Sequence, residues 1–235
     1  MYTTYMTNLS SDQIQQLNNY SVFIQPNGTI LFKGNDIANA LPIIKLISSS
    51  PNEPIAASFF MRRVGMFISM QFYMMTMYDE IWDGPIEQLQ FFSTTEYGNK
   101  TISTFIPPEY FRDVQENRKL DVQLIWEQQC FSIIKQLRLK CSISPLVLWE
   151  NVFGYLLWHY YTFFENPALE EKARNDWYLL KDSSIWESFS TKEYFRLYLK
   201  DQQPAELLNT TVRTTCCFSK DIPGLQKCGF CPQSK

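Results

Sequence analysis

The stretch "IAASFFMRRVGMFISMQFYMMTMY", residues 55–78, decides the class of fold. It reads as one long helix. Its most apolar part, residues 64–78, has about 15 residues, short of the roughly 20 that a membrane-spanning helix needs. Five methionines follow helical spacing and are expected to fill the core rather than bind a metal: Met61, Met66, Met70, Met74 and Met77. The stretch therefore predicts a long buried helix in a mainly helical protein.

The composition of the 235-residue chain is that of a folded globular protein. Hydrophobic residues make up 45% of it, which argues against disorder, and aromatic residues make up 16%. The net charge of −3 and the lack of a lysine- or arginine-rich block argue against a nucleic-acid partner. We therefore expect a globular protein with an interior or cleft rich in aromatic rings.

Two further segments bear on the cellular location. The N-terminus, "MYTTYMTNLSSDQ", lacks the basic start and apolar stretch of a secretory signal, so a cytoplasmic location with reduced thiols is expected. Residues 145–164 are long enough to cross a bilayer but carry Glu150, Asn151 and His159, and ionisable groups in a membrane are costly. We expect a second buried helix there and no integral membrane segment. His159, the single histidine, is expected to be a core residue rather than a ligand.

Turn residues divide the chain into helices and two β-hairpins. Residues 21–34, around Pro-Asn-Gly, predict the first hairpin, and residues 89–106, with Gly98-Asn99 at the turn, predict the second. Asn35 is expected to cap a helix over residues 36–47, which Pro42 would kink or divide. The other predicted helices cover residues 55–78, 116–139, 145–164, 168–181 and 191–200. The predicted fold class is α+β: one mainly helical domain over residues 1–235, with residues 1–54 as an N-terminal hairpin and helix region.

Four of the six cysteines lie in the C-terminal stretch "TTCCFSKDIPGLQKCGFCPQSK", residues 214–235, with the spacing C-C-x10-C-x2-C. Four thiolates can hold zinc or an iron–sulfur cluster. Cys228 and Cys231 form a ready chelate, whereas the adjacent Cys216 and Cys217 can both reach one ion only after a local kink. The two irons of a [2Fe–2S] cluster are a larger target for adjacent thiols. The spacing therefore favours [2Fe–2S] and leaves zinc open, while Cys130 and Cys141, at apolar helical positions, are expected in the core.

This spacing resembles the signature of the FhuF-like ferric-siderophore reductase family, and it matches at all four positions. Residues 58–75, "SFFMRRVGMFISMQFYMM", are similar to that family's Arg-Arg helix, and residues 144–158, "SPLVLWENVFGYLLW", to its tryptophan-containing helix. The first fifty residues have no counterpart. The resemblance implies a C-terminal [2Fe–2S]-binding segment over residues 209–235 with four cluster ligands: Cys216, Cys217, Cys228 and Cys231. It also implies a fold similar to the C-terminal region of siderophore synthetases that work without nonribosomal peptide machinery.

The activity implied by the resemblance is one-electron reduction of Fe³⁺–siderophore chelates, of hydroxamate or citrate-hydroxamate type, with release of Fe²⁺ in the cytosol. Hard oxygen donors hold Fe³⁺ better than Fe²⁺, so one electron weakens the chelate. The chain has no Gly-x-Gly-x-x-Gly and no Walker-type loop, so we expect a separate electron donor such as a ferredoxin or a flavoprotein. Two alternatives remain: a zinc-stabilised interaction module without redox activity, and a cluster-based redox or iron sensor.

Basic residues in two segments are candidate contacts for the chelate. The tail carries four against the single acid Asp221: Arg213, Lys220, Lys227 and Lys235. They predict attraction of an anionic chelate or an acidic donor, with an ordinary solvated loop as the alternative. For Arg62 and Arg63, a structural salt bridge is favoured over contact with a chelate. Four tryptophans are candidates for an aromatic pocket: Trp126, Trp158, Trp177 and Trp186.

Overall fold

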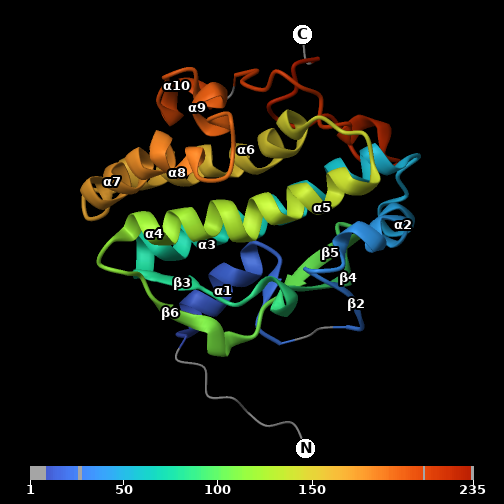
Figure 1. Ribbon diagram of the computed structural model, residues 1–235, viewed down its shortest axis with the longest axis horizontal. Helices are drawn as coiled ribbons and strands as arrows, with labels where there is room; N and C mark the ends of the chain where they lie inside the picture. Colours follow the sequence, from blue (N-terminus) through green and yellow to red (C-terminus); the bar gives the residue numbers. More distant parts are fainter. Residues whose placement is uncertain (1–8, 26–27, 209, 234–235) are drawn as a thin grey trace, which may run out of the picture.

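Helix α3 (Glu53–Tyr78) runs through the middle of the computed structural model (Figure 1). The Asn52 side chain caps it by accepting a hydrogen bond from the Ile55 N–H, and Pro54 occupies the first turn, where its missing N–H is not needed. The helix ends before Asp79, whose φ of 55° is left-handed. Buried residues lie all around its circumference, which is typical of a central helix. The predicted helix over residues 55–78 and its burial are confirmed.

The structure describes residues 9–25, 28–208 and 210–233. They form a mainly helical α+β single domain with a mixed four-stranded sheet and a two-stranded sheet. In chain order the elements are α1 (Ser11–Asn19), β1 (Val22–Phe23), β2 (Ile30–Lys33), α2 (Ile37–Ser48), α3, β3 (Glu80–Trp82), η1 (Ile86–Gln88), β4 (Gln90–Glu96), β5 (Asn99–Phe105), η2 (Pro108–Tyr110), β6 (Phe111–Asp113), α4 (Arg118–Gln123), η3 (Leu124–Phe131), α5 (Ser132–Lys140), α6 (Pro145–Phe164), α7 (Glu170–Leu180), α8 (Ser183–Glu187), α9 (Tyr194–Leu199), α10 (Pro204–Leu207) and η4 (Ser219–Asp221).

Helix α6 packs along α3 (Figure 1). It begins as predicted, with Ser144 accepting a hydrogen bond from the Leu146 N–H. The two helices approach closely at Gly65, where a Cβ would lie 2.8 Å from the Asn151 carbonyl oxygen and 3.0 Å from the Val152 Cα. Any larger residue at this position would push α3 away from α6. Burial between protein elements accounts for the apolar character of both helices, and no helix in the described parts of the chain is both long and apolar enough to span a bilayer.

Residues 118–140 form one helical run, in agreement with the predicted helix, but its middle part η3 is π-helical. Gln129 of η3 accepts a hydrogen bond from Gln71 of α3 at 2.7 Å. Gln71 also accepts from the Trp82 N–H at 2.9 Å and donates to the Trp82 carbonyl at 2.6 Å. These buried amides satisfy one another and tie β3 to α3 and η3.

The four-stranded sheet has the order β1-β5-β4-β2. Strands β4 and β5 form the predicted hairpin over residues 89–106, but Tyr97 and Gly98, with φ of 50° and 79°, occupy its turn in place of Gly98-Asn99. The predicted hairpin over residues 21–34 is wrong. Strand β1 pairs in parallel with β5, and β2 pairs antiparallel with β4, so the two lie at opposite edges of the sheet. Each of these short strands pairs with a seven-residue strand of the β4–β5 hairpin, which is a longer partner than the other short strand. Pro26 and Asn27 of the predicted turn lie outside the described residues.

Helix α2 differs from its prediction at two points. Asp36, not Asn35, occupies the N-cap position, and the helix continues through Pro42 without a break. Proline has no N–H, so the hydrogen bond to the Ala38 carbonyl, four residues earlier, cannot form. Pro42 is on the exposed face, where water can satisfy that carbonyl, so the helix persists.

Helix α7 packs against α6, α3 and α4, α8 packs against α4, and α9 and α10 pack on α6 (Figure 1). The predicted helices over residues 168–181 and 191–200 correspond to α7 and α9. The short helices α8 and α10 were not predicted, because four or five residues are too few to show helical periodicity. Asp176 of α7, fully buried, joins three elements: it accepts hydrogen bonds from Thr76 of α3 at 2.8 Å and from Arg118 of α4 at 2.7 Å.

His159 of α6 is half-buried beside aromatic rings, at the edge of the core in which it was predicted to lie. Its Nε2 is 2.6 Å from the hydroxyl of Tyr20, and its ring packs edge-on against Tyr20 and Tyr73. Burial lowers the pKa of His159 from 6.5 to about 3. The imidazole is therefore neutral in the folded protein at physiological pH.

The Asp176 network gives a first prediction. Asp176→Ala leaves the Arg118 guanidinium without its main partner in a largely buried site and should destabilise the protein by about 3 kcal/mol. The matched control is Glu170→Ala, which removes an exposed pair with Arg174 and should cost less than about 0.5 kcal/mol. Urea unfolding followed by circular dichroism measures both, and equal effects would contradict this account.

His159 gives a second prediction. Its pKa is lower in the folded state than in the unfolded state, so the unfolded chain binds the proton first as pH falls. Stability is therefore unaffected above pH 6.5 and falls by about 1.4 kcal/mol per pH unit between about pH 6 and pH 4. His159→Phe should remove this part of the pH dependence. Unfolding free energies of both proteins from pH 4 to pH 7.5 give the difference, and parallel curves would refute the assignment.

Candidate metal centre

The C-terminal segment, residues 210–233, lies against α6 and the N-terminal half of α3 (Figure 1). One turn of 3-10 helix, η4, is its regular element. Its position therefore depends on side chains that reach it from α3 and α6.

Glu150 of α6 holds the start of this segment. Its side chain is 1% exposed. One carboxylate oxygen accepts hydrogen bonds from the N–H and hydroxyl of Thr214 at 2.9 and 2.7 Å. The other accepts from the N–H of Thr215 at 2.9 Å and from its hydroxyl. Hydrogen bonds to a buried carboxylate are strong, so Glu150 fixes the two residues directly before Cys216.

Arg213 is a second fixed point and is only 6% exposed. Its Nη1 donates to the Glu150 carbonyl at 3.0 Å and to Asn151 Oδ1 at 2.8 Å, and its Nε donates to the Thr215 carbonyl at 3.2 Å. The Glu150 carboxylate lies 3.8 Å from Nε. Its Nη2 is buried and has no hydrogen-bond partner among the described residues. A buried positive charge with one unused donor therefore stands beside the cysteines.

Ser58 and Arg62, one turn apart on α3, anchor the chain around Cys217. Asn151 Nδ2 donates to Ser58 Oγ at 2.9 Å, and Ser58 Oγ donates to the Cys217 carbonyl at 2.7 Å. Arg62 Nη1 donates to Ser219 Oγ at 2.8 Å. Residues four apart share a helix face, so one side of α3 holds both ends of the Cys217–Ser219 stretch.

The chain turns sharply just after the adjacent cysteines. Phe218 has a φ of 58°, a left-handed conformation that is strained for a bulky side chain. Its N–H donates to the Cys216 sulfur at 3.3 Å. Adjacent thiols need a local kink to reach one metal site, and Phe218 supplies a kink at the next residue.

The side chains of Cys217 and Cys228, one from each half of the cysteine motif, lie close enough to affect each other's pKa. The neighbouring Cys228 side chain, with Arg213 and Arg62, lowers the pKa of Cys217 to about 5. The same pairing raises the pKa of Cys228. A lowered pKa favours the thiolate, which is the form that binds metals.

A tight turn carries the second cysteine pair, with the Cys231 N–H donating to the Cys228 carbonyl at 3.1 Å. The ring of Phe230 inside this turn packs on Gly154 of α6: a Cβ on Gly154 would meet two ring carbons at 3.2 Å. An aromatic contact therefore attaches this turn to α6.

The structure brings together two of the four predicted ligands, Cys217 and Cys228. Within the described residues, no group of three or more histidine, cysteine, aspartate or glutamate side chains is arranged to hold a metal ion. Cys231 is buried and Cys216 half-buried in the same short segment, outside this pair. Cys130 and Cys141 are buried elsewhere, as predicted, and burial raises the pKa of both.

A cavity of about 250 Å³ opens beside Cys228, between the tail and α6. It is lined by Arg62, Glu150, Asn151, Gly154, Tyr155, Trp158, Arg213, Cys228, Gly229 and Phe230. Of the four predicted ligands, Cys228 is the one in this lining.

The paired arginines of α3 have different roles. Arg63 forms a salt bridge with Glu96 at 2.6 Å and donates to the Ile102 carbonyl at 2.7 Å, so the structural interpretation is confirmed for this residue. Arg62 turns to the tail, where it binds Ser219 and lines the cavity.

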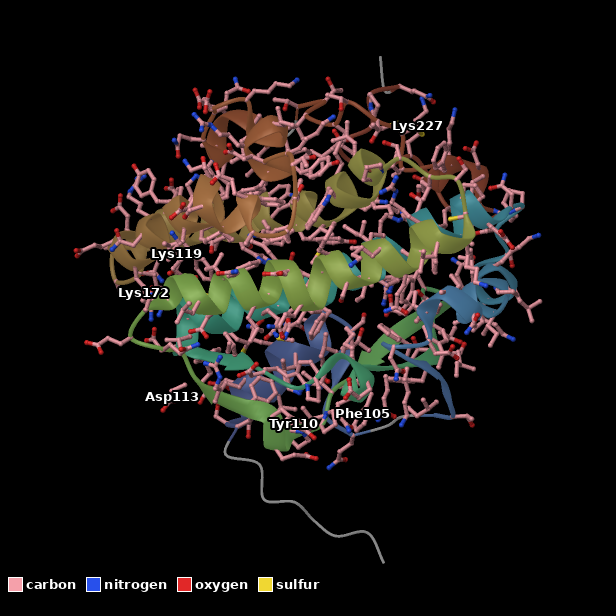
Figure 2. The ribbon with its side chains drawn as sticks, in the orientation of Figure 1. Phe105, Tyr110, Asp113, Lys119, Lys172 and Lys227 are labelled. Atoms are coloured by element: carbon pink, nitrogen blue, oxygen red, sulfur yellow. The ribbon has the colours of Figure 1, made fainter. Side chains whose placement is uncertain are left out.

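The basic residues of the tail do not form one patch. Arg213 is buried within the anchor of the segment, whereas Lys220 and Lys227 are exposed. Lys227 lies at the edge of the molecule (Figure 2), and its Nζ donates to the Gln233 carbonyl at 2.7 Å. Lys235 lies outside the described residues. Within residues 210–233, the solvent-facing members of the predicted patch are Lys220 and Lys227.

The four predicted tryptophans do not share a pocket. Trp126, Trp177 and Trp186 are at most 1% exposed, and the rings of Trp126 and Trp186 lie 5.5 Å apart within the core. Aromatic side chains pack on one another there, as is common in ring-rich interiors. Trp158, 48% exposed, is the member that lines the cavity. Met61, Met70 and Met74 of the methionine series are fully buried, which confirms their core role, whereas Met66 is half-buried and Met77, near the C-terminal end of α3, is exposed, so the prediction is wrong for Met77.

Comparison with known proteins adds no assignment: no family model and no curated protein matches this chain. The assignment of the site therefore rests on its own residues.

Four residues that hold the tail were not predicted as site residues: Ser58, Glu150, Asn151 and Ser219. Glu150 and Asn151 carried a signal, because two polar residues in the middle of an apolar helix need buried partners. Ser58 and Ser219 carried none.

Glu150 gives a third prediction. Glu150→Gln keeps the shape of the side chain but offers one acceptor oxygen where two are used, so the Thr214–Thr215 anchor should weaken by about 2 kcal/mol. Amide hydrogen exchange over residues 210–233 should become roughly 30-fold faster, with α3 unchanged. Glu165→Gln, at the exposed end of the same helix, is the matched control. Equal exchange in both variants would show that Glu150 does not anchor the tail.

Proposed function

We propose that Cys216, Cys217, Cys228 and Cys231 bind a [2Fe–2S] cluster, and that the chain is an oxidoreductase that reduces Fe³⁺–siderophore chelates to release Fe²⁺. The observation that carries the proposal is the proximity of the Cys217 and Cys228 side chains beside a cavity that Cys228 lines. It joins the two halves of a cysteine motif that are separated by ten residues in sequence.

The chemistry of the site fits such a group. A cluster held by four thiolates carries a net negative charge. Buried Nη2 of Arg213 and Nε of Arg62 lack hydrogen-bond partners among the described residues, and both side chains stand close enough to Cys217 to stabilise its thiolate. The Phe218 N–H already donates to the Cys216 sulfur, a contact that tunes cluster potentials. Closing Cys216 and Cys231 onto the Cys217–Cys228 pair would complete the set of ligands.

The residues of the tail favour [2Fe–2S] over a structural zinc ion. Zinc sites use pairs of cysteines separated by two to four residues, and Cys216 and Cys217 are adjacent. The kink at Phe218 comes after this pair rather than between its two cysteines. Two irons accommodate this arrangement more readily than one tetrahedral ion does.

The protein's part in the proposed reaction is to position the cluster and to tune its reduction potential. When bound, a [2Fe–2S] group supplies electrons one at a time. Arg213 and Arg62 place positive charge beside the thiolates, which stabilises added negative charge and raises the reduction potential. The electron comes from outside, from a ferredoxin or a flavoprotein, and the exposed Lys220 and Lys227 offer an acidic donor a complementary surface.

Hydroxamate and citrate-hydroxamate chelates are the proposed substrates, in keeping with the resemblance of the cysteine motif. Their oxygen donors hold Fe³⁺ far better than Fe²⁺, so one electron releases the iron and leaves the siderophore intact. The same resemblance supports a cytoplasmic site of iron release and a fold akin to the C-terminal region of siderophore synthetases that act without nonribosomal peptide machinery.

The proposal gives a fourth prediction. Protein purified without oxygen should be red-brown and contain about two irons and two sulfides per chain, with a one-spin EPR signal after reduction by dithionite. Ferric siderophore should then reoxidise it. Cys216→Ala, Cys217→Ala, Cys228→Ala and Cys231→Ala should each lose the signal.

Cys130→Ala is the matched control, because Cys130 is a buried cysteine outside the tail, and it should keep the signal. A colourless protein with one zinc per chain, also after anaerobic reconstitution with iron and sulfide, would overturn the reductase and indicate a structural clasp. A cluster that ferric siderophore fails to reoxidise would indicate a sensor.

A further inference from the structure

The cavity beside Cys228 is next to the proposed metal centre but is not needed to form it. The anchors of the tail use three residues of the cavity lining, Glu150, Asn151 and Arg213. Tyr155 and Trp158 of α6 also line the cavity, and neither side chain contributes to those anchors.

Trp158 is an unusual surface residue. It is 48% exposed although it sits on a helix whose other large side chains are mostly buried. A tryptophan offers a large rigid face at low entropic cost, which is why this residue type is enriched at binding sites. With Tyr155 and Phe230, it gives the cavity three aromatic lining residues, and Cys228 lines the same cavity.

Building on the proposed function, we propose that this cavity is the docking site of the ferric chelate, with Trp158 packing on the chelate and Cys228 as the point where the electron leaves the protein. Cys217 and Cys231 are each 2% exposed and Cys216 is outside the cavity lining, so Cys228 offers the shortest route to a bound chelate. Electron transfer falls steeply with distance, which favours that route.

The proposed reduction transfers one electron from the protein to the docked chelate. Fe³⁺ in the docked chelate gains it and becomes Fe²⁺, and the external ferredoxin or flavoprotein replaces it. The bonds that break are those between iron and the hydroxamate oxygens, which remain on the siderophore and take up protons from water.

The size of the cavity sets the selectivity. About 250 Å³ is below the roughly 300–1,000 Å³ of pockets that enclose a whole small-molecule ligand. Only one hydroxamate arm and the adjacent edge of the iron complex can enter, while the rest of the siderophore stays in solvent. We therefore expect binding to depend on the iron–hydroxamate edge and to tolerate different backbones joining the hydroxamates.

A binding experiment with gallium tests this inference separately from catalysis. Ga³⁺ forms hydroxamate chelates of the same charge and shape and is not reduced under these conditions. Calorimetric titration of the purified protein with a Ga³⁺ tris-hydroxamate should give one site. Trp158→Leu should weaken binding about 10-fold or more, the loss of roughly one aromatic contact and its buried area. Iron and sulfide content should remain unchanged.

A second variant and a control complete the test. Gly229 lines the cavity, and a Cβ there meets no described atom within 4 Å, so Gly229→Leu should fill the opening and reduce binding. Tyr178→Leu changes an aromatic residue 63% exposed on α7, outside the cavity lining, and should bind like the parent protein.

Unchanged affinity in Trp158→Leu and Gly229→Leu, an equal loss in Tyr178→Leu, or no binding of the gallium chelate would each overturn the docking site. Those outcomes would leave a reductase with a normal cluster standing. Conversely, binding that depends on Trp158 in a protein that holds no iron or sulfide would retain the docking site and refute the reductase.

Discussion

The close approach of α3 and α6 at Gly65 is the constraint on which the site depends. Because Gly65 has no side chain, the Asn151–Val152 backbone comes near enough for Asn151 to donate to Ser58. The two helices supply the side chains that anchor the tail. Ser58 and Arg62 belong to α3, and Glu150 and Asn151 belong to α6. A missing side chain in the central helix thus determines where the cysteines lie, although no cysteine touches it.

The buried charges beside the tail position the cysteine segment. Burying Glu150 and Arg213 removes both from water, and a well-packed apolar pair would often be as stable. An apolar pair could not replace these functions. Glu150 accepts hydrogen bonds from two successive backbone amides and their hydroxyls, and Arg213 places positive charge near Cys217. The polarity of this part of α6 therefore follows from the tail that it supports.

The sequence predicted those elements whose signals are local. Long apolar runs located α3 and α6, and the spacing of the cysteines located the candidate centre. The hairpin over residues 21–34 failed because a turn signal reports that the chain bends, not which distant strand the next segment joins. The role of Glu150 was equally hidden, since its partners lie about sixty residues further along the chain and only the fold brings them together.

The attachment of the second cysteine pair has a consequence for how the proposed cluster would be loaded. The hydrophobic core includes Ile222 of the tail, and the Cys228–Cys231 turn follows that residue and rests on α6 through Phe230 and Gly154. Opening this turn moves the Phe230 ring off Gly154 and exposes the buried Cys231 while the helices stay packed, so it is a local event. Loading of the proposed cluster is then uncoupled from folding, in contrast with zinc fingers, which need their ion to fold at all. On this proposal a ribosome can release a finished fold that is still empty, and the cluster can be delivered, lost and restored over the lifetime of one molecule.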